Sequence, residues 1–438
     1  MQVCDGIISA DFIVTQNERR EIVRDGAVAV RGARVAAIVS RVEAERDWAP
    51  AWRRSLGRAV ILPGLINAHT HAPMTLLRGL ADDLPLMEWL NKHIFPCESG
   101  LTPRMLEVGT ALACAEMLSC GITAFADMYL NERQIYRTVD KIGMRALVGE
   151  GLFSFPSIGY ADPAVAFDLA REQAGELAGH SRLRYAVCPH SIYTTGPEIL
   201  EKSAALAAEL DLPLHIHLAE SGEETRMSLE MYGCRPVEVC RRAGILGPRT
   251  LAAHGVDLLE EEMELLAQNG VSIAHNPRSN MKLASGIAPV PALLALGCNV
   301  CLGTDGAAGN NRLNLFQEMS ACALLHKVFS GDPTVLPAQT ALDMATLHGA
   351  RALSWPELGR LAPGGPADLA ALDLASPGLT PLYNPVSQLV YAAGGHEVCL
   401  TMVEGRILYE QGRFSSLDYR ELLLEARQLA LLCAGNAA

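Results

Sequence analysis

The sequence predicts an α/β protein: a (β/α)8 barrel of the TIM type with a small β-sandwich module built from both chain ends. Strand-like and helix-like segments alternate through a middle section of about 300 residues, a usual length for such a barrel. Further strand-like segments stand outside that section, and 438 residues suffice for a barrel with an accessory module. We expect residues 61–361 to form the barrel. Residues 1–60 with 362–438, including a C-terminal helix, should form the module.

The chain ends are predicted to supply short strands to one module. The expected strands cover residues 6–14, 27–31, 34–38, 367–372 and 401–409. Gly32-Ala33 is the expected hairpin turn at the N-terminal end, and Gly364-Gly365 and Gly405 mark turns at the other end. Because these two groups of strands flank the long middle section, we expect them to pair with each other.

Eight strands are predicted in the middle section. They cover residues 60–68, 122–127, 145–150, 184–189, 214–218, 250–254, 271–275 and 299–304. Thr102-Pro103 begins a helix that ends near Gly121, and Asp257 with Glu260 resembles a capping box. The acidic run 260–264 is most simply a solvated helix face. A doubly wound sheet is less suitable, because no G-x-G-x-x-G follows the first strand.

Composition narrows the class of protein. Half of the residues are hydrophobic, and the formal charge of −13 argues against a nucleic-acid or anionic-membrane surface. No apolar stretch approaches the roughly 18 residues of a membrane span, so we expect a cytoplasmic protein. The 12 cysteines are scattered, which favours reduced thiols. Cys298 and Cys301 form a C-x-x-C within an apolar run and are expected to fill the core.

Polar residues gather at the predicted C-terminal ends of the barrel strands, where barrel active sites lie. These residues are His69, His71, Asp127, Glu150, His190, His217, His254, His275 and Asp305. In Asn67-Ala-His69-Thr-His71 the two imidazoles share one face of an extended segment and can reach one ion. His217 ends a second H-x-H, and Asp305 follows the last strand. Three imidazoles and a carboxylate around an open position suit Zn²⁺ or Fe²⁺ in hydrolysis.

Several motifs together resemble the amidohydrolase superfamily. They are Leu-Pro-Gly-Leu-Ile-Asn-Ala-His-Thr-His at 62–71, His-Leu-Ala-Glu at 217–220, Leu-Ala-Ala-His at 251–254 and Gly-Thr-Asp-Gly-Ala-Ala at 303–308. The likeness extends to residues 76–90, 279–286 and 384–388, and so covers essentially the whole chain. Within the superfamily the chain is most similar to the 5′-methylthioadenosine/S-adenosylhomocysteine deaminases. Triazine chlorohydrolases and guanine deaminases resemble it less closely.

The resemblance implies a role for each matching residue. The implied metal ligands are His69, His71, His217 and Asp305, holding one Zn²⁺ per subunit, with Fe²⁺ as the alternative. Glu220 matches the proton-shuttling glutamate, His254 orients the attacking water, and Asp305 accepts its proton. Glu98 would hold the ribose hydroxyls, His190 would contact the purine, and Glu220 and Asp305 would also touch the substrate. Trp89 is a candidate for packing near the base or for the core, and His215 is expected to be structural.

The implied reaction is hydrolytic deamination of an adenosine-type nucleoside with release of ammonia. Glu220 would protonate N1 of the adenine ring and later the departing amine. Hydrolysis of another amino- or halogen-substituted heteroaromatic compound (guanine, a pterin or a triazine) stays open, as does a metal-bound carrier or regulatory protein. The expected partners are the nucleoside and water, without nucleic acid or membrane; a homo-oligomer is left open.

Three positions depart from the resemblance. Glu150 stands about where some relatives have an arginine for the amino-acid tail of the substrate, and residues 151–170 contain no arginine. Gly309 stands where a serine is common. Asp127, His275 and Asn276 are expected to support the site. These departures do not affect the predicted metal ligands. They leave open which 5′ substituent of the nucleoside the protein accepts.

Overall fold

The barrel is present in the computed structural model, which describes residues 1–436. Its strands are β6 (Leu65–Thr70), β7 (Ile122–Tyr129), β8 (Arg145–Leu152), β9 (Leu183–Tyr185), β10 (Cys188–Pro189), β11 (Leu214–Leu218), β12 (Thr250–His254), β13 (Ser272–His275) and β14 (Asn299–Leu302). They form two parallel sheets, β6 to β10 and β11 to β14. Backbone hydrogen bonds join the sheets at both edges: His215 N donates to Val187 O over 3.0 Å, and Asp305 N donates to His69 O over 2.9 Å. The predicted α/β barrel is thus confirmed.

Two predicted strands are divided. The segment 60–68 is not one strand: β5 (Ala59–Pro63) belongs to the terminal sheet and β6 to the barrel. Gly64 lies between them, where a Cβ would stand 2.0 Å from Thr123 Oγ1, so the chain passes at close range to β7. The segment 184–189 similarly divides into β9 and β10, which both pair with β8.

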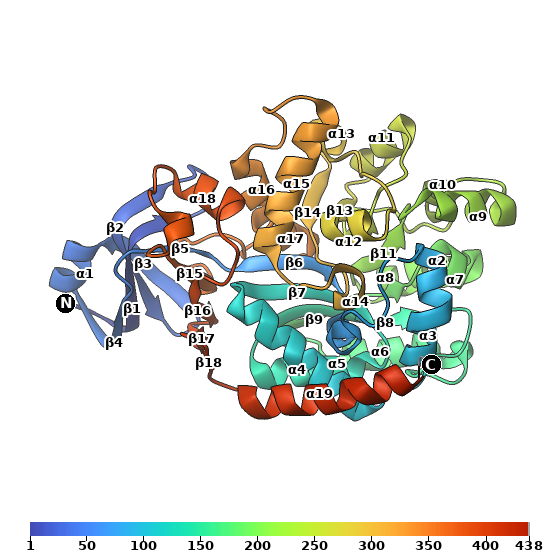
Figure 1. Cartoon of the computed structure of the whole chain (residues 1–438), viewed down its shortest axis with the longest axis horizontal. Helices are drawn as coiled ribbons and strands as arrows, with labels where there is room; N and C mark the ends of the chain where they lie inside the picture. Colours follow the sequence, from blue (N-terminus) through green and yellow to red (C-terminus); the bar gives the residue numbers. More distant parts are fainter. Residues whose placement is uncertain (437–438) are drawn as a thin grey trace.

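Helices cover the outside of the barrel (Figure 1). They are α4 (Pro103–Ser119), α5 (Glu132–Ile142), α6 (Ala166–Glu176), α8 (Pro197–Glu209), α10 (Pro236–Arg242), α11 (Glu260–Gln268), α13 (Val290–Ala295), α15 (Leu315–Ser330), α16 (Ala338–Met344) and α17 (Leu347–Ala352). Thr102 caps α4 as predicted, because its side chain accepts a hydrogen bond from Met105 N. The predicted cap at Asp257 is wrong, since this carboxylate accepts from Thr225 Oγ1 at 2.5 Å.

The acidic run is also only partly solvated. The carboxylate of Glu262 is buried, lies 3.0 Å from Arg235 Nε and accepts a hydrogen bond from Leu259 N at the start of α11. One acid of the run therefore anchors the helix, and the prediction of a solvated face fails at this position.

A second set of elements, most of them short, follows the C-terminal ends of the strands and positions the site. They are η1 (Ala72–Leu77), α2 (Leu86–Trp89), η2 (Leu90–Ile94), α3 (Phe95–Glu98), η3 (Pro163–Val165), α7 (Ile192–Thr195), α9 (Gly222–Tyr232), α12 (Pro277–Lys282) and α14 (Ala307–Asn310). Most of them begin within a few residues of a strand end, so the side chains that follow each strand are held by short, ordered segments.

The two chain ends form one nine-stranded sheet in the order β18-β17-β16-β15-β5-β1-β2-β3, with β4 paired to β1. Its remaining elements are β1 (Gln2–Val14), β2 (Ile22–Arg31), β3 (Arg34–Ser40), α1 (Arg41–Asp47), β4 (Trp48–Ser55), β15 (Leu369–Asp373), η4 (Pro377–Leu379), α18 (Pro385–Tyr391), β16 (Val398–Val403), β17 (Arg406–Glu410) and β18 (Arg413–Phe414). The two ends meet where β5 pairs with both β1 and β15. The expected pairing of the chain ends is present; the description as a sandwich stays a prediction.

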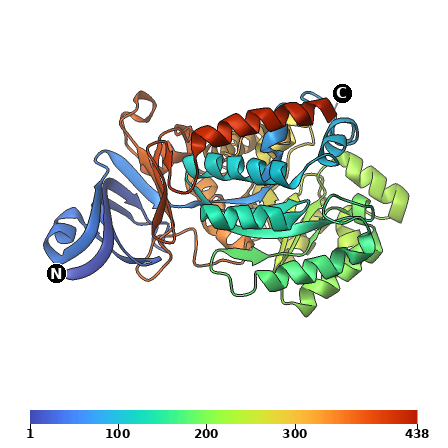
Figure 2. The ribbon, with the colours of Figure 1, turned by 90° about the horizontal axis from the view of Figure 1, so that it is seen from below.

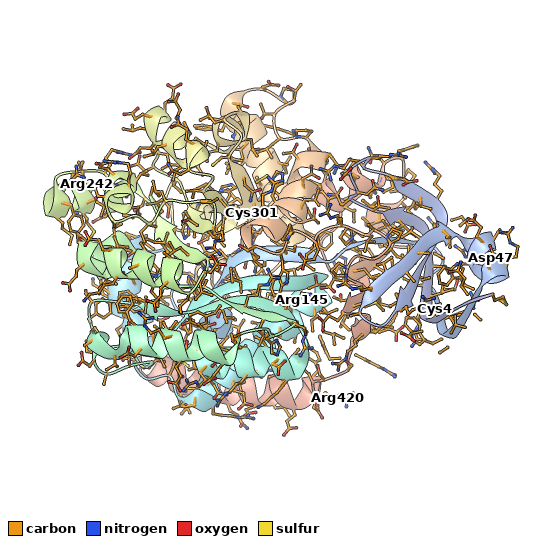
Figure 3. All side chains as sticks on the ribbon, turned by 180° about the vertical axis from the view of Figure 1, so that it is seen from behind. Cys4, Asp47, Arg145, Arg242, Cys301 and Arg420 are labelled. Carbon is orange, nitrogen blue, oxygen red and sulfur yellow. The ribbon has the colours of Figure 1, made fainter. Side chains whose placement is uncertain are left out.

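The C-terminal helix lies against the barrel. Helix α19 (Tyr419–Asn436) runs along α4 on the side of the barrel, and its C-terminal end points away from the N-terminus (Figures 1 and 2). Arg104 on α4 and Glu425 on α19 form an ion pair with 2.6 Å between nitrogen and oxygen. At the junction of barrel and terminal sheet, buried Arg145 lies 2.7 Å from Asp368 (Figure 3).

Two expectations concern the chain as a whole. Among residues 1–436, no helix is both long and apolar enough to cross a bilayer. All 12 cysteines are free thiols. Cys298 and Cys301 are buried, and their sulfurs contact the backbone oxygens of Val271 and Ile273, which fits the expected core role (Figure 3 labels Cys301).

Candidate active site

The predicted site residues do meet at the C-terminal ends of the strands. His69 and His71 come from the end of β6, His217 from β11, His254 from β12, and Asp305 from the loop after β14. His254 and Asp305 have φ angles of +78° and +60°. Such left-handed backbone is costly for a residue with a side chain, and it gathers at functional sites. The chain thus holds two of these residues in strained positions that aim them at one centre.

Four of the residues place their donor atoms around one point. Asp305 Oδ1 lies 3.2 Å from His71 Nε2 and 3.6 Å from His69 Nε2. His71 Nε2 lies 3.3 Å from His217 Nε2. Two nitrogens at about 2.0–2.1 Å from one tetrahedral ion stand about 3.3–3.4 Å apart. The spacing is therefore that of ligands around a single metal ion.

The other ring nitrogen of each histidine is already engaged. His71 Nδ1 donates to Met128 O over 2.6 Å, and His217 Nδ1 donates to His190 O over 2.8 Å. His69 Nδ1 lies 2.9 Å from Nε2 of His215, which occupies the supporting position expected for it. These contacts orient the rings so that all three Nε2 atoms face the centre.

The donor set fits a metal ion electrostatically. Burial lowers the pKa of His69 to about 4, so its imidazole is neutral and offers a lone pair. Burial also acts to lower the pKa of His71, but the Asp305 carboxylate outweighs it and raises this pKa to about 9. The pair is thus arranged to hold a positive charge. Within the described residues, His69 Nε2 is buried without a hydrogen-bond partner, and the set contains no lysine or arginine that would compete with a cation.

Glu220 and His254 stand beside this cluster. His254 Nδ1 is held by Asn280 Oδ1 at 2.9 Å, and His254 Nε2 lies 3.8 Å from Glu220 Oε1. Burial raises the pKa of Glu220 above its ordinary value. A carboxyl group with a raised pKa is suited to give and take a proton near neutral pH.

A cavity opens over the cluster. Its lining includes all the predicted substrate-binding residues: Trp89, Glu98, His190, Glu220 and Asp305. The rest of the wall is largely apolar, with Phe95, Tyr129, Leu130, Phe153, Tyr193 and Leu283 among its residues. A mostly apolar pocket with a few convergent polar groups is typical of a small-molecule site.

The polar lining residues are fixed in different ways. Glu98 ends α3 and is only 7% exposed, and burial raises its pKa to about 7. His190 Nδ1 lies 2.9 Å from Thr194 Oγ1, and burial lowers the pKa of His190 to about 3, so this ring is neutral. The indole nitrogen of Trp89 donates to Ala81 O, which holds the ring at the cavity wall.

Glu150 does not face the cavity. Its carboxylate accepts hydrogen bonds from the backbone nitrogens of Asn131 and Glu132 at 2.7 and 2.8 Å, and from Gln173. It therefore satisfies the free N–H groups at the start of α5. The expected position near the 5′ substituent is wrong, because this side chain points out of the barrel toward the helix.

The other rim residues lie behind the cluster. Asp127 Oδ1 accepts from Ala72 N at 2.7 Å and so fixes the turn after His71. Asn276 Nδ2 lies 3.4 Å from His254 Nδ1. His275 contacts His326 on α15 and does not line the cavity.

Sequence reasoning assigned no role to three supporting residues. Ser279 Oγ donates to Asp305 Oδ2 over 2.5 Å, Asn280 holds His254, and Thr194 holds His190. Ser279 and Asn280 belong to the segment 279–286, which carried part of the resemblance, so a signal for them was present. For Thr194 the sequence carried no signal except its closeness to His190.

The family of the chain can be stated from comparison with known proteins. The amidohydrolase family matches residues 60–408, which include every strand of the barrel. The chain belongs to the amidohydrolase family. The family expected from the motifs is thereby confirmed.

Similar members of this family are known. A 5-methylthioadenosine/S-adenosylhomocysteine deaminase of Nitratidesulfovibrio vulgaris (strain Miyazaki F) is 56% identical over 426 residues, 97% of each chain. A protein of the same name from Lawsonia intracellularis is 49% identical, over 98% of this chain and 97% of its own. A zinc-bound adenosine deaminase structure from Xanthomonas campestris is 38% identical, with a TM-score of 0.96 and 99% of both chains covered. Atrazine chlorohydrolase from Arthrobacter aurescens, 23% identical with a TM-score of 0.89 over 97% of this chain and 100% of its own, shares the fold.

Proposed function

We propose that this amidohydrolase is a metal-dependent deaminase that hydrolyses adenosine-type nucleosides, such as 5′-methylthioadenosine, and releases ammonia. The observation that carries the proposal is the placement of Glu220. Its buried carboxyl lines the same cavity as His71, His217 and Asp305, three residues after His217 in the chain, and burial raises its pKa. The names of the most similar relatives, and of the 38% identical zinc-bound structure, support the same reaction.

We infer that the ion is Zn²⁺, held by His69, His71, His217 and Asp305. Three imidazoles and one carboxylate, without a thiolate, are ligand types that hydrolytic zinc sites use. When bound, such an ion supplies a Lewis acid that makes water a nucleophile at neutral pH. The zinc-bound solved structure supports this identity over Fe²⁺.

The chain's own side chains account for orientation and proton movement. Asp305 accepts a proton from the attacking water, and Ser279 holds the second oxygen of that carboxylate. His254, fixed through Nδ1 by Asn280, presents Nε2 to the water. Glu220 gives its proton to N1 of the ring, takes up the proton of the new C6 hydroxyl and carries it to the departing amine. The proton that Asp305 accepted from water then restores Glu220. Water adds at C6, the C6–N bond breaks, and ammonia leaves with a hypoxanthine nucleoside as the product.

The same cavity supplies places for the base and the sugar. We propose that neutral His190 contacts the purine and that Glu98 accepts hydrogen bonds from the ribose hydroxyls. Trp89 would pack against the substrate from the cavity wall. All three residues line the cavity: Trp89 and Glu98 come from the short helices after β6, and His190 directly follows β10. They can therefore contact one nucleoside from two sides.

A second hollow adjoins the cavity beyond Glu98 and sets our expectation for the 5′ group. Phe95, Glu98, Leu130 and Phe153 line both hollows, and the second adds Ser99, Phe155, Pro156, Ser157 and Ile158. No lysine or arginine lines either hollow within the described residues. An apolar 5′ substituent therefore finds apolar walls, whereas the carboxylate of an amino-acid tail finds no cation and has Glu98 nearby.

We accordingly expect kcat/KM to be about tenfold or more higher for 5′-methylthioadenosine than for S-adenosylhomocysteine, because a desolvated charge without a partner costs binding energy. Steady-state ammonia release with both substrates measures this ratio, and 5′-deoxyadenosine serves as a second neutral substrate. An equal or higher kcat/KM for S-adenosylhomocysteine would refute the expectation without affecting the assignment as a deaminase.

The division of the chain is also a proposal. Residues 61–361 would form the catalytic unit, and residues 1–60 with 362–438 the second. Ile8, Val28 and Leu400, from three different strands of the terminal sheet, belong to one buried cluster, which supports a sandwich-like fold for this unit. Its final helix, α19, would then attach this second unit to the barrel.

The proposed activity is tested by an ammonia-release screen. The substrates are adenosine, 5′-deoxyadenosine, 5′-methylthioadenosine, S-adenosylhomocysteine and aminodeoxyfutalosine, with guanine, a pterin and a triazine as outsiders. We expect turnover of several nucleosides and none of the outsiders. If the protein hydrolysed only guanine, the pterin or the triazine, it would be a hydrolase of another heteroaromatic compound that uses the same metal centre.

A further inference from the structure

A second cluster of potential metal ligands lies behind the active site. It consists of His275, the last residue of β13, and of Cys322 and His326 on α15. All three side chains are buried, with at most 1% of their surface exposed. One potential ligand atom from each residue lies within 4.8 Å of the other two. Cys322 and His326 are four residues apart, so they share one face of the helix.

The distance between the two imidazoles is that of metal ligands. His275 Nε2 and His326 Nε2 face each other at 3.4 Å. This is longer than the roughly 2.7–3.2 Å of an ordinary hydrogen bond from nitrogen. It matches the spacing of about 3.3–3.4 Å for two nitrogens on one tetrahedral ion with bonds of about 2.0–2.1 Å. The active-site pair His71 and His217 shows nearly the same separation, 3.3 Å.

The chemical state of the cluster also suits a cation. Burial lowers the pKa of His326 to about 4 and that of His275 well below its usual range, so both rings are neutral and offer lone pairs. Burial raises the pKa of the Cys322 thiol, and its proton would be released when a metal binds. Glu318, one turn before Cys322, is already engaged with Asn310 and the backbone of Arg278.

A plain imidazole–imidazole hydrogen bond explains the cluster less well. The long contact at Nε2 is the only polar interaction of the His275 ring among the described residues, because Nδ1 has no partner. A buried polar ring is ordinarily better satisfied than this. A metal ion at Nε2 would replace that weak contact and leave Nδ1 as it is. The contact between two neutral rings also gives no reason for a third ligand-type atom, the sulfur of Cys322, at the same point.

We propose that His275, Cys322 and His326 form a second metal site, which binds a thiophilic transition-metal ion of the zinc class. It shares no residue with the catalytic cluster. The ion would tie α15 to β13, the strand that leads into Asn276 and the segment holding Ser279 and Asn280. The ion would hold in place Ser279 and Asn280, which position Asp305 and His254, without contacting substrate.

The thiolate gives the test a signature that the catalytic cluster cannot produce, because that cluster contains no cysteine. The chain is depleted of metal with a chelator, reloaded with Co²⁺ and dialysed, and bound cobalt is measured by elemental analysis. We expect two equivalents per chain and the near-ultraviolet charge-transfer absorption of cobalt bound to a thiolate. One equivalent without that absorption would overturn the proposal in the unmodified protein.

Variants locate the second ion. Cys322→Ala should reduce bound cobalt from two equivalents to one and abolish the thiolate absorption, and it should remove the rise in Tm that Zn²⁺ gives at this site. Cys240→Ala is the matched control, since Cys240 is a buried cysteine outside any ligand cluster. It should keep two equivalents of cobalt and the thiolate absorption.

His326→Gln provides a second variant if Cys322→Ala does not fold. Thiolate absorption that survives in both cluster variants would contradict the assignment. Neither cobalt content nor thiolate absorption depends on deaminase activity. The second metal site and the proposed function are therefore tested separately, and one can fail without the other.

Discussion

Glu220→Gln is expected to keep its metal and lose turnover. Glutamine preserves the size of the side chain but cannot donate a carboxyl proton to N1 or carry one to the departing amine. General acid–base groups typically contribute about 10²–10⁴ in rate, and we expect kcat for 5′-methylthioadenosine to fall by about that factor. Because Glu220 lies beside the ligands without belonging to them, elemental analysis should find an unchanged metal content.

The matched control is Glu223→Gln. Glu223 lies three residues further along and is exposed on α9, where it pairs with Arg226. Its loss should leave both kcat and metal content near those of the parent. If Glu220→Gln proved metal-free, or turned over at a near-normal rate, Glu220 would have no part in moving protons.

The second large effect is expected at Glu98, which distinguishes a nucleoside enzyme from one that acts on a free base. A carboxylate at this position can accept hydrogen bonds from both vicinal hydroxyls of a ribose, which a pterin or triazine lacks. Charge-assisted hydrogen bonds contribute about 1.5–3 kcal/mol each. We therefore expect Glu98→Ala to reduce kcat/KM for adenosine derivatives by roughly 10²-fold. Metal content should be unchanged.

A substrate change tests the same contact without altering the protein. The 2′,3′-dideoxy analogue should be a poor substrate for the parent enzyme, and Glu98→Ala should discriminate little between it and the ribonucleoside. Equal turnover of both by the parent would mean that Glu98 only supports its own loop. That result would move the assignment toward a free heterocycle.

The position of the site was predictable because parallel strands end together. Once residues 69, 217, 254 and 305 were assigned to strand ends, the barrel geometry required their side chains to converge. The H-x-H spacing added that His69 and His71 point the same way. Those inferences needed only the order of the strands and the identity of the residue at each end.

Other features depended on tertiary contacts that no local pattern encodes. Glu150 lies near the C-terminal end of β8, as His217 lies near that of β11, yet its side chain faces outward and accepts hydrogen bonds from the N–H groups at the start of α5. Strand alternation makes such a difference depend on a one-residue shift in register. Likewise, the run 60–68 is apolar except for Asn67, and the close approach of Gly64 to Thr123 marks the change from terminal sheet to barrel.

The central claim is most directly tested by product stoichiometry in metal-depleted and reloaded protein. The chain is treated with a chelator, divided, and one half is reloaded with Zn²⁺ before 5′-methylthioadenosine is added to both. Ammonia and the purine product are then measured together. Our account predicts that the reloaded protein forms ammonia and the corresponding hypoxanthine nucleoside in equal amounts, and that the depleted protein forms neither. Failure of the reloaded protein to release ammonia from any adenosine nucleoside, or equal activity in both halves, would contradict it.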